Sequence, residues 1–222
     1  MPASILDTTQ PPSLSEEAYR RIEDMIVTRI LPPGSMISEN QLADDLKCGR
    51  TPVREALQRL KLEGFVEIHP RRGAQVTTVD AGKQLELLEV RRSLEDLMVR
   101  LAAERASRAQ RDRMTVLAAE ILKAADDPVM SRYFAANREI HLLCAAATQN
   151  AMLARTIGVI HGLSRRFWYT YIEDERRSEA ASLHSTVLTA IATGDKNAAS
   201  QGATALLDFL ERLTRLAIER KL

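Results

Sequence analysis

The chain has 222 residues, of which 45% are hydrophobic and 27% charged, and its formal net charge is +1. This composition indicates one or two folded domains and excludes both a disordered chain and a general polycation. Aromatic residues make up only 4%, which favours helices packed on helices. No apolar run is long enough to span a membrane and the first residues lack the order of a signal peptide, so we expect a cytoplasmic protein.

The first part of the chain predicts a short tail and then a helix. Residues 1–12 are rich in proline and threonine and are expected to be disordered. A helix is predicted from Ser13, where Ser13 and Glu16 have the form of a capping box, to the prolines of residues 31–34. Its apolar stripe consists of Tyr19, Ile22, Ile26 and Ile30.

Two more short helices and two strands follow. A helix is predicted from Ser38, and another begins with Thr51 as N-cap and a proline at the first helical position, ending at Gly64. The apolar stripe of this last helix is Val53, Ala56, Leu57 and Leu60. Alternating apolar residues at 66–68 and 74–78 then predict two strands joined by the sequence HPRRG.

Basic residues are concentrated in this region. Between Lys47 and Arg72 the chain has seven lysines and arginines against three acidic residues. Two short helices followed by a hairpin are typical of a winged helix-turn-helix, whose second helix enters the major groove of duplex DNA. We therefore predict DNA contacts from the helix entrance and the tip of the wing, by Arg50, Thr51, Arg54, Arg71, Arg72 and Gly73.

The sequence from Pro33 to Val76, and above all its RTPVREAL element, resembles the DNA-binding domain of GntR-type bacterial transcription regulators. The resemblance implies an operator-binding homodimer. It also places Arg50, Thr51, Arg54 and Gly73 at positions that the family uses to touch DNA. The chain departs from the family at Asn40, where arginine is common.

After Asp80 the sequence predicts only long amphipathic helices. Breaks are expected near Ser107, at residues 127–128, at 149–150, around 172–177 and at 194–195. The predicted fold class is mainly α. It combines an N-terminal winged helix-turn-helix at residues 13–79 with an antiparallel all-α bundle at residues 80–222.

Helical spacing predicts a polar site inside the bundle. Asn137 and His141 share a face with apolar residues, and His184 does the same on a later helix. A single inward histidine is usually a satisfied core residue, but two of them with an asparagine indicate a polar cavity.

This part of the chain is similar to the FadR-type branch, whose C-terminal domain (FCD) is a helical bundle that binds an effector. EVRRSLEDLMVRLAAERAS and REIHLLCAAATQN carry the similarity. Many members hold a divalent metal with Asp-x-x-x-His and two later histidines. Here Asn137 replaces the aspartate, His141 and His184 match, and the third histidine would fall near Leu206. We therefore expect no tightly bound metal, with His141 and His184 as weak ligands of a divalent ion; His161 is a further histidine without a spacing rule in its favour.

The resemblance also places Arg91 toward the effector cavity. A buried arginine needs an anionic partner, so we expect a small carboxylate or other anion, bound by Arg91, Asn137, His141 and His184. Arg165 and Arg166 beside Trp168 are weaker candidates for the same role. The alternative is that Arg91 pairs with a core glutamate such as Glu95.

The leading hypothesis is a ligand-responsive transcription regulator, a repressor, that binds a palindromic operator as a homodimer. One alternative is a DNA-binding dimer whose bundle binds no effector. Another is a metal-dependent helical-bundle enzyme, although the sequence offers neither a nucleophile with a base nor a complete metal set.

Overall fold

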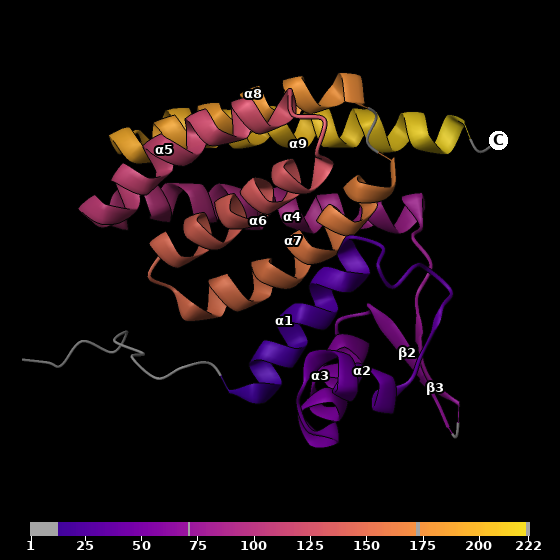
Figure 1. The fold of residues 1–222 in the computed structure, drawn as a ribbon. Coiled ribbons are helices and arrows are strands. Elements are labelled where there is room, and N and C mark those ends of the chain that lie inside the picture. Colours follow the sequence, from indigo (N-terminus) through magenta and orange to yellow (C-terminus); the bar gives the residue numbers. More distant parts are fainter. Residues whose placement is uncertain (1–12, 71, 172–173, 221–222) are drawn as a thin grey trace, which may run out of the picture. The chain divides into compact units, whose positions relative to one another are not determined.

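The computed structural model describes residues 13–70, 72–171 and 174–220 (Figure 1). The chain divides into two compact units, with the division between Val79 and Asp80. The first unit is a winged helix-turn-helix and the second is all-helical, in agreement with the predicted fold class. The expected disorder of residues 1–12 falls outside the described residues.

Three helices form the body of the first unit: α1 (Leu14–Val27), α2 (Glu39–Leu46) and α3 (Arg50–Leu62). The Ser13 side chain accepts a hydrogen bond from the backbone N–H of Glu16, and Ser38 does the same for that of Gln41. Both predicted N-caps are therefore confirmed. The predicted stripe of α3 is buried, and Gly64, at φ +82°, follows the helix end as expected.

Helix α1 ends earlier than predicted. It stops at Val27, where the Thr28 hydroxyl bonds back to the Asp24 carbonyl and Arg29 takes a left-handed conformation with φ +62°. The left-handed residue ends the helix before the prolines are reached. Ile30 consequently lies beyond the helix and is 66% exposed, so its assignment to the buried stripe was wrong.

Helix α3 begins one residue before the predicted N-cap. Gly49 is the N-cap and makes no side-chain capping bond, and Thr51 is already helical. A proline within the first turn lacks only an N–H group that has no partner inside the helix anyway, so Pro52 does not prevent the upstream extension. Arg50 thereby becomes the first residue of the helix.

The wing is a three-stranded antiparallel sheet in the order β1-β3-β2. Strands β2 (Val66–His69) and β3 (Gly73–Val76) form the predicted hairpin, but β3 ends before Thr78. The pairing of β1 (Met36–Ile37) with β3 was not predicted. Gly73 has φ +95°, and a Cβ there would lie 2.6 Å from the Ile37 carbonyl oxygen, so the close approach of β3 to β1 requires glycine at this position.

The second unit contains six helices among its described residues: α4 (Ala81–Arg105), α5 (Arg108–Ala125), α6 (Met130–Ala147), α7 (Ala151–Tyr171), α8 (Asp174–Thr193) and α9 (Lys196–Glu219). The predicted breaks near Ser107 and at 127–128, 149–150 and 194–195 fall between these helices. The break expected around 172–177 is too long, because residues 174–177 already belong to α8; residues 172–173 lie outside the described residues. Ser107 and Gln110 form a complete capping box at the start of α5.

Helix α4 organises this bundle. It packs against α6, α7, α8 and α9, while α5 packs on α6 and α8 (Figure 1). None of the described helices is long and apolar enough to cross a membrane. The core is aliphatic and rich in alanine, except around Arg91, where buried polar side chains from several helices meet.

Candidate functional site

The first candidate site is the exposed face of α3. Arg50, Thr51 and Arg54 are all exposed, and they project from the side opposite the buried apolar stripe. Arg54 is not free in this structure, because its Nε and Nη2 atoms each donate to Oε2 of Glu39 at 3.2 Å. The face therefore presents two cations one helical turn apart, one of which is held by a carboxylate of α2.

The wing supplies the second part of this surface. Arg72 is exposed at the tip, directly before the left-handed Gly73. Arg71 lies outside the described residues. The guanidinium groups of arginine match phosphate oxygens and base edges, so the wing and the α3 face have the chemistry of a duplex-DNA interface.

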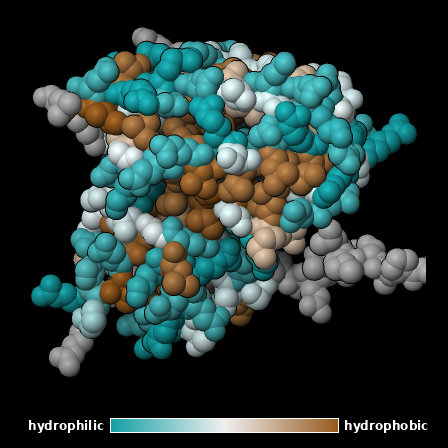
Figure 2. All heavy atoms as spheres, turned by 180° about the vertical axis from the view of Figure 1, so that it is seen from behind, coloured by the Kyte–Doolittle hydropathy of each residue, from teal (hydrophilic) through white to brown (hydrophobic). Residues whose placement is uncertain are grey.

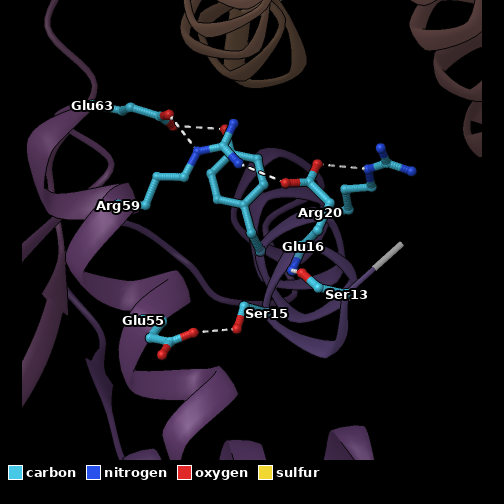
Figure 3. Close-up of polar contacts among 8 residues, drawn as sticks. Ser13, Ser15, Glu16, Arg20, Glu55, Arg59 and Glu63 are labelled. Atoms are coloured by element: carbon cyan, nitrogen blue, oxygen red, sulfur yellow. Dashed lines mark hydrogen bonds and ion pairs between the residues drawn. The ribbon is translucent and has the colours of Figure 1, made fainter. Parts of the chain in front are cut away.

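Helix α3 is fixed on α1 by a polar cluster (Figure 3). The Arg59 guanidinium lies over the Tyr19 ring, 3.6 Å from its centroid, and donates to Glu63 at 2.9 Å and to Glu16 at 2.8 Å. The Tyr19 hydroxyl donates to Glu63 at 2.6 Å; burial and this carboxylate raise the pKa of Tyr19 well above its usual range. A second contact joins Ser15 to Glu55. These contacts set the position from which α3 presents its exposed face.

The second candidate site is a cavity inside the helical unit. The four predicted effector residues all line it: Arg91 from α4, Asn137 and His141 from α6, and His184 from α8. The rest of its lining is Ser164, Arg165, Trp168, Ala180, Leu206 and Leu210. Its volume of about 20 Å³ has room for about one water molecule.

Arg91 is the centre of a buried polar network. It is 2% exposed, and its Nε donates to Glu95 at 2.8 Å while Nη1 donates to the Ser164 hydroxyl at 2.9 Å. Its Nη2 lies 3.5 Å from His141 Nε2. The expectation that Arg91 needs an external anion is corrected here, because Glu95 provides the counter-charge, as the alternative interpretation had it.

Burial alone would raise the pKa of Glu95, but the charge of Arg91, and then that of His161, reverse the effect and hold this pKa well below its usual range. Glu95 is thus ionised and forms a true ion pair with Arg91.

The three histidines of the helical unit lie together. The His141 ring stacks on His161 at 4.0 Å and meets His184 edge-on at 5.7 Å. Burial, followed by the charges of His161 and Arg91, lowers the pKa of His141 well below its usual range. Burial and Arg91 lower the pKa of His184 to about 3. The His141 and His184 rings are therefore neutral at pH 7.

The neutral state of His141 fixes its tautomer. The Arg91 guanidinium can only donate, so His141 Nε2 accepts and the ring proton lies on Nδ1. This Nδ1 is buried and has no hydrogen-bond partner among the described residues. A buried donor without an acceptor costs free energy, which makes it a point where a ligand can gain affinity.

The donor set does not fit the divalent metal that the family resemblance raises. Within the described residues, no three His, Cys, Asp or Glu side chains are grouped so that they could hold a metal ion. Asn137 Nδ2 contacts His184 Nε2 at 2.9 Å, and His161 Nε2 contacts Glu95 at 2.9 Å, so ring nitrogens face protein groups. Leu206, near which the family resemblance implies a third histidine, lines the cavity as an apolar residue.

Sequence reasoning missed several members of both sites. Glu39, Ser164 and Gln84, whose amide donates to Ser164 at 3.1 Å, were not considered. The spacing of His161, Ser164 and Trp168 along α7 corresponds to one helix face and could have indicated a common inward orientation. No local sequence pattern indicates that Glu39 belongs to the site, since its partner Arg54 lies on another helix.

Two weaker candidates for the effector site can also be placed. Arg165 lines the cavity, whereas Arg166 is buried outside its lining.

Comparison with known proteins agrees with this architecture. Residues 14–76 match the bacterial regulatory proteins of the gntR family, and residues 86–209 match the FCD domain. The chain belongs to the GntR family of bacterial transcription regulators, in its FCD branch. GntR-family proteins regulate transcription and are not enzymes, so the helical unit corresponds to an effector-binding domain.

Sequence relatives support the assignment of this GntR-family chain, and a solved structure shares its fold. It is 32% identical to the Nta operon transcriptional regulator of Aminobacter aminovorans, over 79% of this chain and 83% of that protein. It is 28% identical to the Uxu operon transcriptional regulator of Escherichia coli, over 92% and 86%. The fold resembles that of E. coli McbR/YncC, with a TM-score of 0.81 at 21% identity, covering 94% of this chain and all of that one.

Proposed function

We propose that this GntR-family chain is a homodimeric repressor that binds a palindromic operator and is released by a small anionic metabolite. The observation that carries the proposal is the exposed face of α3, where Arg50, Thr51 and Arg54 stand at the entrance of the second helix of a helix-turn-helix. A repressor role is further supported by RspR of E. coli, a transcriptional repressor 30% identical over 47% of this chain. Acting on bacterial DNA, the protein would work in the cytoplasm.

A hydrophobic stripe on α4 supports the homodimer. Figure 2 shows a continuous hydrophobic area at the height of α4, the helix that lies behind α6 in Figure 1. On α4 itself, Val90 and Leu97 are 55% and 45% exposed. The stripe has the alternating spacing of three and four residues typical of a helix–helix seam and comprises Leu87, Val90, Leu94, Leu97 and Leu101. A second copy would cover it and present a second α3 to the DNA.

Selection from a pool of random duplex DNA tests the DNA-binding proposal. We expect the full-length chain to enrich a palindrome and to bind it as a dimer. Arg54→Ala should weaken binding to that site by about 1–3 kcal/mol and relax the preference at one base pair per half-site. Arg72→Ala should weaken binding to every sequence and flatten the salt dependence.

A Val90→Glu/Leu97→Glu double variant should be monomeric in light scattering and lose affinity for the palindrome. Equal binding of a monomer to non-palindromic DNA would contradict the dimer proposal. Unchanged operator affinity in Arg54→Ala would show that α3 does not read the DNA.

The effector proposal rests on the cavity. Two guanidinium groups line it, that of Arg91, which is already paired with Glu95, and that of Arg165. The His141 Nδ1 proton has no acceptor among the described residues. An anionic oxygen would supply that acceptor. Because the cavity has room for about one water, any larger ligand must displace lining side chains, which would link binding to a rearrangement of the bundle. We propose that no resident metal takes part.

Thermal unfolding with a panel of acetate, lactate, succinate and citrate tests the effector site. A ligand at about 100 times its dissociation constant should stabilise the protein by about 2.7 kcal/mol and release the selected DNA. Asn137→Ala and His141→Ala should abolish both effects and keep DNA affinity, whereas the exposed Thr186→Ala should keep all of them. Ligand-induced release that survives Asn137→Ala and His141→Ala would place the site elsewhere, and stoichiometric metal in the purified protein would contradict the metal-free proposal.

A further inference from the structure

One ion pair connects the exposed face of α3 to α2. Glu39 is the first residue of α2, and Arg54 lies one turn after the first residue of α3. Arg54 Nε and Nη2 both donate to the same carboxylate oxygen, Glu39 Oε2, at 3.2 Å. The pair therefore spans the two helices of the helix-turn-helix at the place where α3 would meet DNA.

Within this pair, Glu39 is the more firmly held partner. Its side chain is 33% exposed against 63% for that of Arg54. Its position directly after the N-cap Ser38 places its charge at the positive end of the α2 dipole. The Glu39 carboxylate is thus the less exposed partner of the contact, and the Arg54 guanidinium is the partner that faces solvent.

The geometry of the contact leaves a defined part of Arg54 available. A guanidinium is planar and has five N–H groups in a fixed fork. Glu39 occupies the edge that contains Nε, so the edge formed by Nη1 and Nη2 remains. That edge offers two parallel N–H groups, the pattern that matches the O6 and N7 acceptors of guanine. Fixing one edge of a planar group also fixes the direction of the other.

We propose that Glu39 is a positioning residue that sets the base specificity of Arg54, selecting guanine at the base pair that Arg54 contacts. This proposal rests on the DNA-binding role of α3. The competing explanation is that Glu39 is only a negative charge near the phosphates. The two explanations differ in direction: loss of a purely repulsive charge would strengthen binding to all sequences, whereas loss of a positioning group would reduce discrimination between bases.

The test measures base preference and overall affinity separately. Full-length wild type, Glu39→Gln, Arg54→Ala and the double variant are titrated against the palindrome selected by wild type. Each is also titrated against single-base variants of that palindrome and against a scrambled duplex. Asp45→Asn is the matched control, because Asp45 is exposed on the same helix and its side chain makes no hydrogen bond or ion pair with the described residues. It removes the same charge without touching Arg54.

We expect Glu39→Gln to reduce the preference for guanine at one base pair per half-site by about tenfold, close to the effect of Arg54→Ala. The double variant should lose no further preference, and Asp45→Asn should keep the full preference while matching Glu39→Gln on the scrambled duplex. Unaltered thermal unfolding of Glu39→Gln would confirm that the fold is intact.

A Glu39→Gln protein that keeps the guanine preference and differs from wild type only in overall affinity would overturn this inference alone. A wild type that selects no sequence, or an Arg54→Ala protein with unchanged preference, would overturn the DNA-reading role of α3 as well.

Discussion

Replacing Glu95 by alanine should lower the free energy of unfolding of the helical unit by about 3–5 kcal/mol. The substitution leaves the Arg91 guanidinium, which is 2% exposed, without its carboxylate, and a buried charge that has lost its partner is strongly destabilising. Urea unfolding monitored by the fluorescence of Trp168 measures this effect. Trp168 is the chain's single tryptophan and lies in the helical unit, so the signal reports that unit.

Two further variants distinguish the stability effect of breaking this buried ion pair from the effect of breaking an exposed one. Glu104→Ala removes the exposed partner of Lys196 and should change stability little. Arg91→Met/Glu95→Leu removes both charges and should recover part of the loss, because an apolar pair carries no desolvation penalty. If Glu95→Ala cost no more than Glu104→Ala, the Arg91–Glu95 network would not be the buried ion pair described above.

The helical unit should lose stability as the pH falls from 7 to 5, by about 1–2 kcal/mol for each of His141 and His184. The folded-state pKa of His184 is about 3 and that of His141 is well below 6.5, so both rings stay neutral in the folded protein. In the unfolded chain they bind protons below about pH 6.5. The unfolded state therefore binds more protons in this range, and acid favours it.

Glu95 does not contribute to the pH dependence of stability between pH 7 and 5. Its folded-state pKa is lowered from an unfolded value of 4.5, so its stabilising effect is lost only as the pH falls below about 4.5. Between pH 7 and 5 the slope belongs to the histidines. The same fluorescence measurement at a series of pH values gives that slope.

Histidine variants identify the groups responsible. His184→Gln should reduce the loss of stability between pH 7 and 5 by the contribution of one histidine, about 1–2 kcal/mol. His69→Gln is the matched control, since His69 lies on β2 of the other unit and is half-exposed, and it should leave the slope unchanged. A slope that survives His184→Gln in full would show that this ring is not held neutral by burial.

Local signals in the sequence predicted most of the helices and strands and the inward faces of the helices. Serine N-caps, glycine stops and apolar periodicity are local signals, and they located the start of α1 and α2, the end of α3 and most of the breaks between the bundle helices. Helical spacing also predicted that Asn137, His141 and His184 face inward, because the direction of a side chain on a helix follows from its position. Local signals failed where several compete: a left-handed residue ended α1 before the prolines, and α3 began upstream of Thr51.

Tertiary structure alone decided which of these side chains meet. Glu39 and Arg54 belong to different helices, as do Glu95 and His161, and no sequence period relates the members of either pair. The short strand β1 exists only because the backbone of β3 lies beside it, and Gly73 permits the close approach. Contacts of this kind depend on how helices and strands pack, and packing is settled by the sum of many buried surfaces rather than by a residue's neighbours in sequence. For this reason the residues of both sites could be placed on faces from the sequence, but their partners, charge states and available donor atoms could not.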